Sequence, residues 1–152
     1  MNTRNNGIKI GKRLLALAFV LCAVASLAAC GGKDGPWTFD LPNGYQVVRE
    51  ESQAVVFGKS GEEFNQMIGD RIIAFCYDDT YIGLKRVPLG SASAQAESYD
   101  EADVKYYLID TVNNVQYGPY TKLEYDGQCD VLPNVDLGDW IKTAKRPKGA
   151  KD

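Results

Sequence analysis

From Trp37 onwards, the sequence consists of short runs in which apolar and polar residues alternate, and residues that favour turns separate these runs. A period of two places every second side chain on the same face of a β-strand. The clearest run covers residues 104–109, and residues 115–117 return after Asn113 and Asn114, which tolerate the backbone of a tight hairpin turn. The pattern predicts antiparallel β structure.

Further segments have the same character: 37–40, 45–49, 53–57, 71–77 and 80–87. Asp78 and Asp79 predict a turn between the last two, because short Asp side chains bond nearby backbone N–H groups. Thr121 and Glu124 match the capping box and predict a short helix from Lys122. The expected fold class is mostly β or α+β, a small antiparallel sheet or sandwich of about six to eight short strands with one or two short helices.

The first thirty residues have a different composition. Four basic residues open the chain, no acidic residue precedes Asp34, and residues 14–30 form an apolar run of 17 residues. This order is typical of a secretory signal. A permanent transmembrane helix is the competing interpretation, but such helices usually have about 20 residues, and no basic cluster follows this run.

The apolar run ends in Leu27, Ala28, Ala29 and Cys30, followed by two glycines. This stretch resembles the bacterial lipobox. The resemblance implies cleavage between Ala29 and Cys30 and attachment of a diacylglycerol to the Cys30 sulfur. Several acyl chains hold a soluble domain on a membrane durably, where a single chain would not.

These observations predict a signal peptide at residues 1–29, a lipidated cysteine and flexible tether at 30–35, one β-rich domain at 36–141 and a charged disordered tail at 142–152. Residues 88–103 are small and polar and are expected to form a mobile surface loop. The expected location is the outer face of the plasma membrane in a Gram-positive cell, or the outer membrane or periplasm in a Gram-negative one.

Processing changes the charge of the chain. The full sequence has a net charge of −3, and removal of residues 1–29 takes away four basic and no acidic residues, which leaves −7. Residues 34–140 contain seven basic and nineteen acidic residues. An acidic domain repels nucleic acid, so we exclude that class of ligand. A basic protein partner is favoured by charge alone.

The cysteine count also changes. Cys22 leaves with the signal peptide and Cys30 carries lipid, so Cys76 and Cys129 remain. In an exported protein they form either one disulfide or two buried free thiols. Both interpretations stay open.

The sequence contains no histidine, which excludes Ser/His/Asp and Cys/His catalysis and imidazole metal ligands. No nucleotide-binding glycine motif occurs, and no cofactor is expected. Nine tyrosines lie beyond residue 30, where core packing is favoured over an interface role.

The leading interpretation is a non-enzymatic surface lipoprotein that acts as an interaction module. One alternative is a carboxylate-based enzyme acting on cell-wall or glycan material, with carboxylates drawn from Asp78, Asp79 or the Asp100–Asp103 stretch. A calcium-binding surface domain is the other alternative, although no EF-hand spacing occurs.

The runs "LPNGY", "YYLID" and "YGPYT", which follow a tryptophan and precede a helix signal, resemble a group of small bacterial lipoproteins of uncharacterised function. The resemblance extends over residues 37–140. Its motifs are structural, so it implies no catalytic or binding residue.

Overall fold

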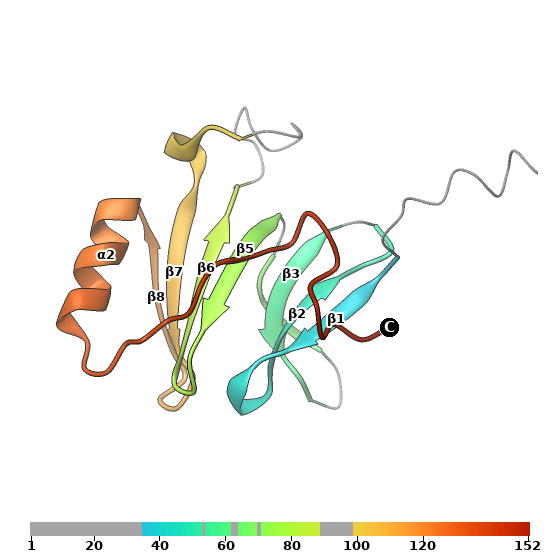
Figure 1. Cartoon of the computed structure of the whole chain (residues 1–152), viewed down its shortest axis with the longest axis horizontal. Coiled ribbons are helices and arrows are strands. Elements are labelled where there is room, and N and C mark those ends of the chain that lie inside the picture. The colour runs from blue at the N-terminus through green and yellow to red at the C-terminus, as the bar shows by residue number, and fades with distance from the viewer. Residues whose placement is uncertain (1–34, 53, 62–63, 70, 89–98) are drawn as a thin grey trace, which may run out of the picture. The chain divides into compact units, whose positions relative to one another are not determined.

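The computed structural model describes residues 35–52, 54–61, 64–69, 71–88 and 99–152. These residues form two antiparallel sheets with nine strands, so the expected mostly β class is confirmed (Figure 1). Sheet A has the order β1-β2-β3-β4, with β1 (Trp37–Asp40), β2 (Tyr45–Arg49), β3 (Val55–Lys59) and β4 (Asn65–Ile68). Sheet B has the order β8-β7-β6-β5-β9, with β5 (Ile72–Tyr77), β6 (Tyr81–Arg86), β7 (Lys105–Asp110), β8 (Val115–Tyr120) and β9 (Ile141–Lys142). The helices are η1 (Pro42–Gly44), η2 (Glu101–Asp103) and α2 (Lys122–Val131).

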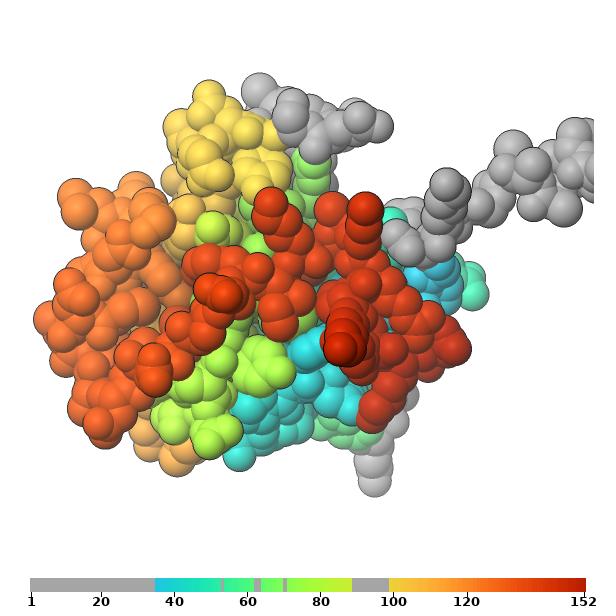
Figure 2. Space-filling view, viewed as in Figure 1, coloured from blue at the N-terminus to red at the C-terminus, as the bar shows by residue number. Residues whose placement is uncertain are grey.

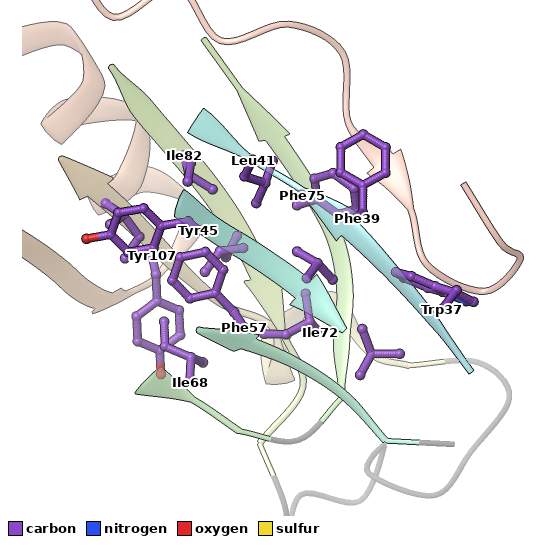
Figure 3. Packing of buried hydrophobic residues seen from close by; sticks show 14 residues of the cluster. Trp37, Phe39, Leu41, Tyr45, Phe57, Ile68, Ile72, Phe75, Ile82 and Tyr107 are labelled. Atoms are coloured by element: carbon purple, nitrogen blue, oxygen red, sulfur yellow. The ribbon is translucent and has the colours of Figure 1, made fainter. Parts of the chain in front are cut away.

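The main core lies between the two sheets (Figure 3). Each sheet turns every second side chain towards the other, as the alternation of the sequence predicts. The rings of Phe39 from sheet A and Phe75 from sheet B lie 4.9 Å apart, and Tyr45 stacks on Phe57 within sheet A at 5.4 Å. Each such buried side chain contributes about 1.5–3 kcal/mol relative to an exposed one, so this layer holds the sandwich together.

The two hairpins expected from the sequence are present, as β5–β6 and β7–β8. In the first turn, the Asp78 carboxylate accepts hydrogen bonds from the N–H groups of Thr80 and Tyr81 at 2.7 and 2.6 Å. Pro119 lies in β8, an edge strand of sheet B, where a missing N–H leaves no ladder bond unmade. Turn chemistry therefore located both hairpins correctly.

Two strands have no counterpart among the sequence predictions. Residues 65–68 form β4, in which only Ile68 is buried. The two-residue strand β9 exists because Ile141 and Lys142 pair with Phe75 and Ala74 of β5. Three of the four residues of β4 are exposed and β9 has only two residues, so neither segment shows the alternation that predicts a strand.

The turn after β1 and the turn after β7 meet and join the two sheets. The Asn43 amide donates to the Thr111 hydroxyl at 2.7 Å. The Asn114 side-chain oxygen accepts hydrogen bonds from the Tyr45 hydroxyl at 3.2 Å and from Lys59 at 2.6 Å. Thus the "LPNGY" stretch and the "NN" turn, distant in sequence, form one polar contact.

Residues 142–152, which we expected to be disordered, pair with both sheets. The buried Thr143 hydroxyl donates to the Ile72 carbonyl at 2.6 Å. Further on, Lys151 forms a β-bridge with Thr38, and its ammonium contacts the Asp40 carboxylate. Figures 1 and 2 show the chain after α2 passing over sheet B and this segment, in red, continuing to β1. The basic side chains of this segment are exposed, while its backbone forms β-type hydrogen bonds with both sheets. Amino-acid composition does not predict such backbone hydrogen bonds.

The expected loop at 88–103 is described only in part. Residues 89–98 lie outside the described residues. The loop ends in η2, where the Asp100 carboxylate accepts a hydrogen bond from the Ala102 N–H at 3.0 Å. This carboxylate therefore caps a turn.

Candidate functional site

The face of sheet B that points away from sheet A carries a second apolar cluster under α2 and the segment after it. Cys76, Tyr125 and Cys129 meet within this cluster, and we call these three residues the thiol cluster. They come from β5 and α2, so tertiary folding brings them together.

The position of Cys76 follows from strand alternation. Phe75 is fully buried in the core between the sheets, so Cys76 points to the opposite face. Its direct partner across the ladder on β6 is Gly83. A glycine there leaves open the space beside the sulfur.

The positions of Tyr125 and Cys129 follow from the helix start. The Thr121 side chain and the Glu124 carboxylate form a capping box that begins α2 at Lys122. Residues 125 and 129 are then four apart and lie on the same helix face. Of all residues in α2, only Tyr125 is fully buried, and Cys129 is half-buried.

Gly83 is in close contact with the thiol cluster. A Cβ at this position would overlap the Tyr125 hydroxyl, lie 2.7 Å from the Cys76 sulfur and lie 3.3 Å from the Trp140 ring. Any other residue would therefore displace the side chains that α2 and the following segment place here.

Aromatic rings cover the thiol cluster. The rings of Tyr106, Tyr125 and Trp140 contact one another at centroid distances between 5.4 and 6.2 Å. The Lys85 ammonium lies 4.4 Å from the Trp140 centroid and 5.5 Å from that of Tyr106. These are cation–π distances, so a positive charge sits at the rim of an otherwise apolar site.

Burial keeps the cluster uncharged. It raises the pKa of Cys76 to about 12, and it also raises the pKa values of Cys129 and Tyr125. Both thiols are therefore protonated at neutral pH in the folded domain. A thiolate is the nucleophilic form of cysteine, so the folded site is not organised for nucleophilic catalysis.

The Tyr125 hydroxyl is buried and makes no hydrogen bond of normal geometry among the described residues. Its polar neighbours are the two thiols, which are weak donors and acceptors. The hydroxyl therefore contributes little as a polar group, and its role is to fill the space above Gly83.

The sequence also predicted a lipobox, a lipid-attachment cysteine and a possible disulfide. Leu27, Ala28, Ala29 and Cys30 lie outside the described residues. Cys76 and Cys129, for which the sequence left a disulfide and two free thiols open, are brought to one hydroxyl and are free thiols in this structure.

Within the described ranges, no three His, Cys, Asp or Glu side chains gather closely enough to hold a metal ion. Asp78, one of the candidate catalytic carboxylates, instead holds its turn and accepts the Asp136 N–H at 3.0 Å. In the same part of the chain, no helix is both long and apolar enough to span a membrane.

Sequence reasoning missed Gly83, Lys85, Tyr125 and Trp140 as parts of this site. The capping box fixed the helix register, and that register places Tyr125 and Cys129 on one face. Nothing in the sequence indicates which strand this face contacts.

Comparison with known proteins gave one match. A family model described as a protein of unknown function (DUF3997) matches residues 42–134, more than half of the chain. The matched region includes the whole thiol cluster and Gly83. No curated protein and no solved structure matches the chain.

Proposed function

Since the chain belongs to this family of proteins of unknown function, its role has to be inferred from its own residues, and we propose that it is a lipid-anchored envelope protein whose β-sandwich acts as a non-enzymatic binding module. The observation that carries the proposal is the apolar run that ends in Leu27-Ala28-Ala29-Cys30. In this proposal Cys30 is the first residue of the mature protein and bears the lipid.

The sandwich begins close to the proposed anchor. Strand β1 starts at Trp37, seven residues after Cys30. Such a segment spans at most about 25 Å even when fully extended. A domain held this way meets ligands within a few nanometres of the membrane surface.

A metabolic label tests the anchor. In bacteria that express the full chain and are fed an alkyne-tagged palmitic acid, we expect label on the wild-type protein and loss of label in Cys30→Ser. Cys22→Ser is the matched control, because it removes a cysteine from the same apolar run and should keep the label. A wild-type chain without label, or a Cys30→Ser chain that keeps it, would refute the lipid anchor.

The surface charge supports a basic partner. Residues 34–140 carry nineteen acidic against seven basic residues. On α2 and the segment after it, Asp126, Asp130 and Asp139 are exposed. Complementary charge accelerates association, and added salt screens it.

Salt-dependent capture tests this partner. We expect envelope proteins retained by the detergent-solubilised chain at about 0.05 M salt to be released at about 0.5 M salt. A variant with Asp126, Asp130 and Asp139 changed to Asn should retain less of the same proteins. If the same proteins are retained at both salt concentrations and equally by the wild type and the variant, the result would count against a basic partner.

A further inference from the structure

We propose that Cys76 and Cys129 form a disulfide that joins strand β5 to helix α2 in the mature protein. This inference rests on the proposed export, because disulfides form and persist in oxidising compartments outside the cytoplasm. The structure then represents the dithiol form of this site.

The first support is convergence. Cys76 lies in the middle of a strand and Cys129 near the end of a helix, yet both thiols lie beside the hydroxyl of Tyr125. They are the only cysteines among the described residues. Cys129 packs against the second apolar cluster, and Cys76 lies on the face of sheet B that this cluster covers, beside Gly83.

The second support is space. Beside Cys76 on the neighbouring strand stands Gly83, so no side chain of β6 separates this sulfur from α2. The group that occupies the space is the Tyr125 hydroxyl, which has no hydrogen bond of normal geometry to hold it there. A shift of this hydroxyl disturbs ring contacts with Tyr106 and Trp140 but breaks no hydrogen bond of normal geometry.

The third support is the weak attachment of α2. Only Tyr125 among its residues is fully buried, while Leu123 and Val131 are 82% and 74% exposed. Gly127, in the middle of the helix, lowers helix stability by about 1 kcal/mol relative to alanine. A covalent bond at Cys129 would hold the helix on the sheet where packing alone is sparse.

The bond forms by exchange with an oxidising disulfide. The Cys129 thiolate, on the more exposed residue, attacks one sulfur of the oxidant and releases one thiol. The Cys76 thiolate then attacks the Cys129 sulfur and releases the second thiol. The protein loses two protons and two electrons, and the oxidant gains them as two thiols.

The order of events follows from burial. Once α2 is docked, both thiols are buried wholly or in part and remain protonated, so exchange is slow. We therefore expect oxidation before α2 docks. After docking, the same burial protects the disulfide from external reductants.

Mass spectrometry of the chain tests the bond. The full chain is taken from the envelope, denatured in N-ethylmaleimide without reductant and digested with trypsin. Cleavage after Arg71, Lys85, Lys122 and Lys142 places the two cysteines in separate peptides, 72–85 and 123–142. We expect these peptides to be linked and to separate on reduction. Two separate peptides that both carry N-ethylmaleimide would overturn the proposal.

Single variants provide the controls. In Cys76→Ser, the Cys129 peptide should be alkylated, and in Cys129→Ser the Cys76 peptide should be alkylated. Reduction should lower the Tm of the wild type by about 10–20 °C and leave that of the double serine variant unchanged. An equal effect of reductant on both proteins would also overturn the proposal.

A refolding experiment separates this inference from the proposed export. The purified full chain is unfolded, reduced and refolded with oxidised and reduced glutathione. Linked peptides in the refolded protein would support the pairing even if Cys30 carried no lipid label. Separate alkylated peptides after refolding would refute it even if Cys30 were lipidated.

Discussion

At the scale of single residues, Gly83 has the tightest surroundings of the site. It lies in the central region of sheet B, where a side chain would normally stabilise a strand by packing. Here the position is occupied from above by the Tyr125 hydroxyl and from the side by the Cys76 sulfur. The glycine is explained by close approach of neighbouring groups.

Gly83→Ala should therefore destabilise the reduced protein by about 1–3 kcal/mol, since added atoms in a packed site force side chains to shift. Urea unfolding followed by the fluorescence of Trp37 and Trp140 would measure it. Gly127→Ala is the matched control: no atom lies within 4 Å of its added Cβ, so this change should be neutral or stabilising by up to about 1 kcal/mol.

Removing the Tyr125 hydroxyl should relieve part of the clash. Tyr125→Phe alone deletes a hydroxyl that has no normal hydrogen bond. In combination with Gly83→Ala it should recover some of the lost stability, which is a non-additive effect. Strictly additive changes would show that the two groups do not compete for the same space.

At the scale of elements, the β7–β8 hairpin depends on Asp110. This carboxylate is 5% exposed and accepts three hydrogen bonds: from the Val112 N–H at 3.1 Å, the Asn113 N–H at 2.8 Å and the Asn113 amide at 2.7 Å. Burial acts to raise its pKa, but the bonds from Asn113 and Val112 outweigh it and hold the pKa below the ordinary value. The charged form is therefore favoured in the folded protein.

This direction predicts how stability depends on pH. Because the folded pKa of Asp110 is lowered, its stabilisation is present above the unfolded pKa of about 3.9 and is lost as the pH falls through the folded value. In Asp110→Asn, an amide NH2 group replaces one carboxylate oxygen and cannot accept the hydrogen bond that the Asn113 side chain donates. The variant should therefore be less stable by about 1–2 kcal/mol at neutral pH. The deficit relative to wild type should shrink between about pH 4 and pH 2.

Thermal unfolding over this pH range would measure the difference. Asp139→Asn, at an exposed position outside the hairpin, should follow the wild-type curve. A deficit for Asp110→Asn that stays constant down to about pH 2 would contradict the role assigned to the ionised carboxylate.

At the scale of the whole molecule, the sequence predicted the fold class because its signals are local. Alternation, the Asp78 turn and the Thr121–Glu124 capping box each act over a few residues. Those features located both hairpins of sheet B and the start of α2. The strands β4 and β9 were missed because they carry no alternating pattern: three of the four residues of β4 are exposed, and β9 has only two residues.

The path of residues 142–152 was missed for a related reason. Their composition predicts solvation, and most of their charged side chains are exposed. The bridge between Lys151 and Thr38 is a backbone interaction between the two ends of the described chain. The number of charged residues in a segment does not indicate which other segment its backbone pairs with.

The sequence by itself determined the acidic charge, the absence of histidine and the β pattern, and it is the basis of the proposed lipid anchor, because these depend on residue identity and short spacing. Only the tertiary structure decided that Cys76, Gly83 and Tyr125 meet. That meeting depends on which face of sheet B receives α2, and the choice is made by packing of the second apolar cluster. Long-range packing of this kind sums many weak contacts from distant segments, so no short stretch of sequence contains it.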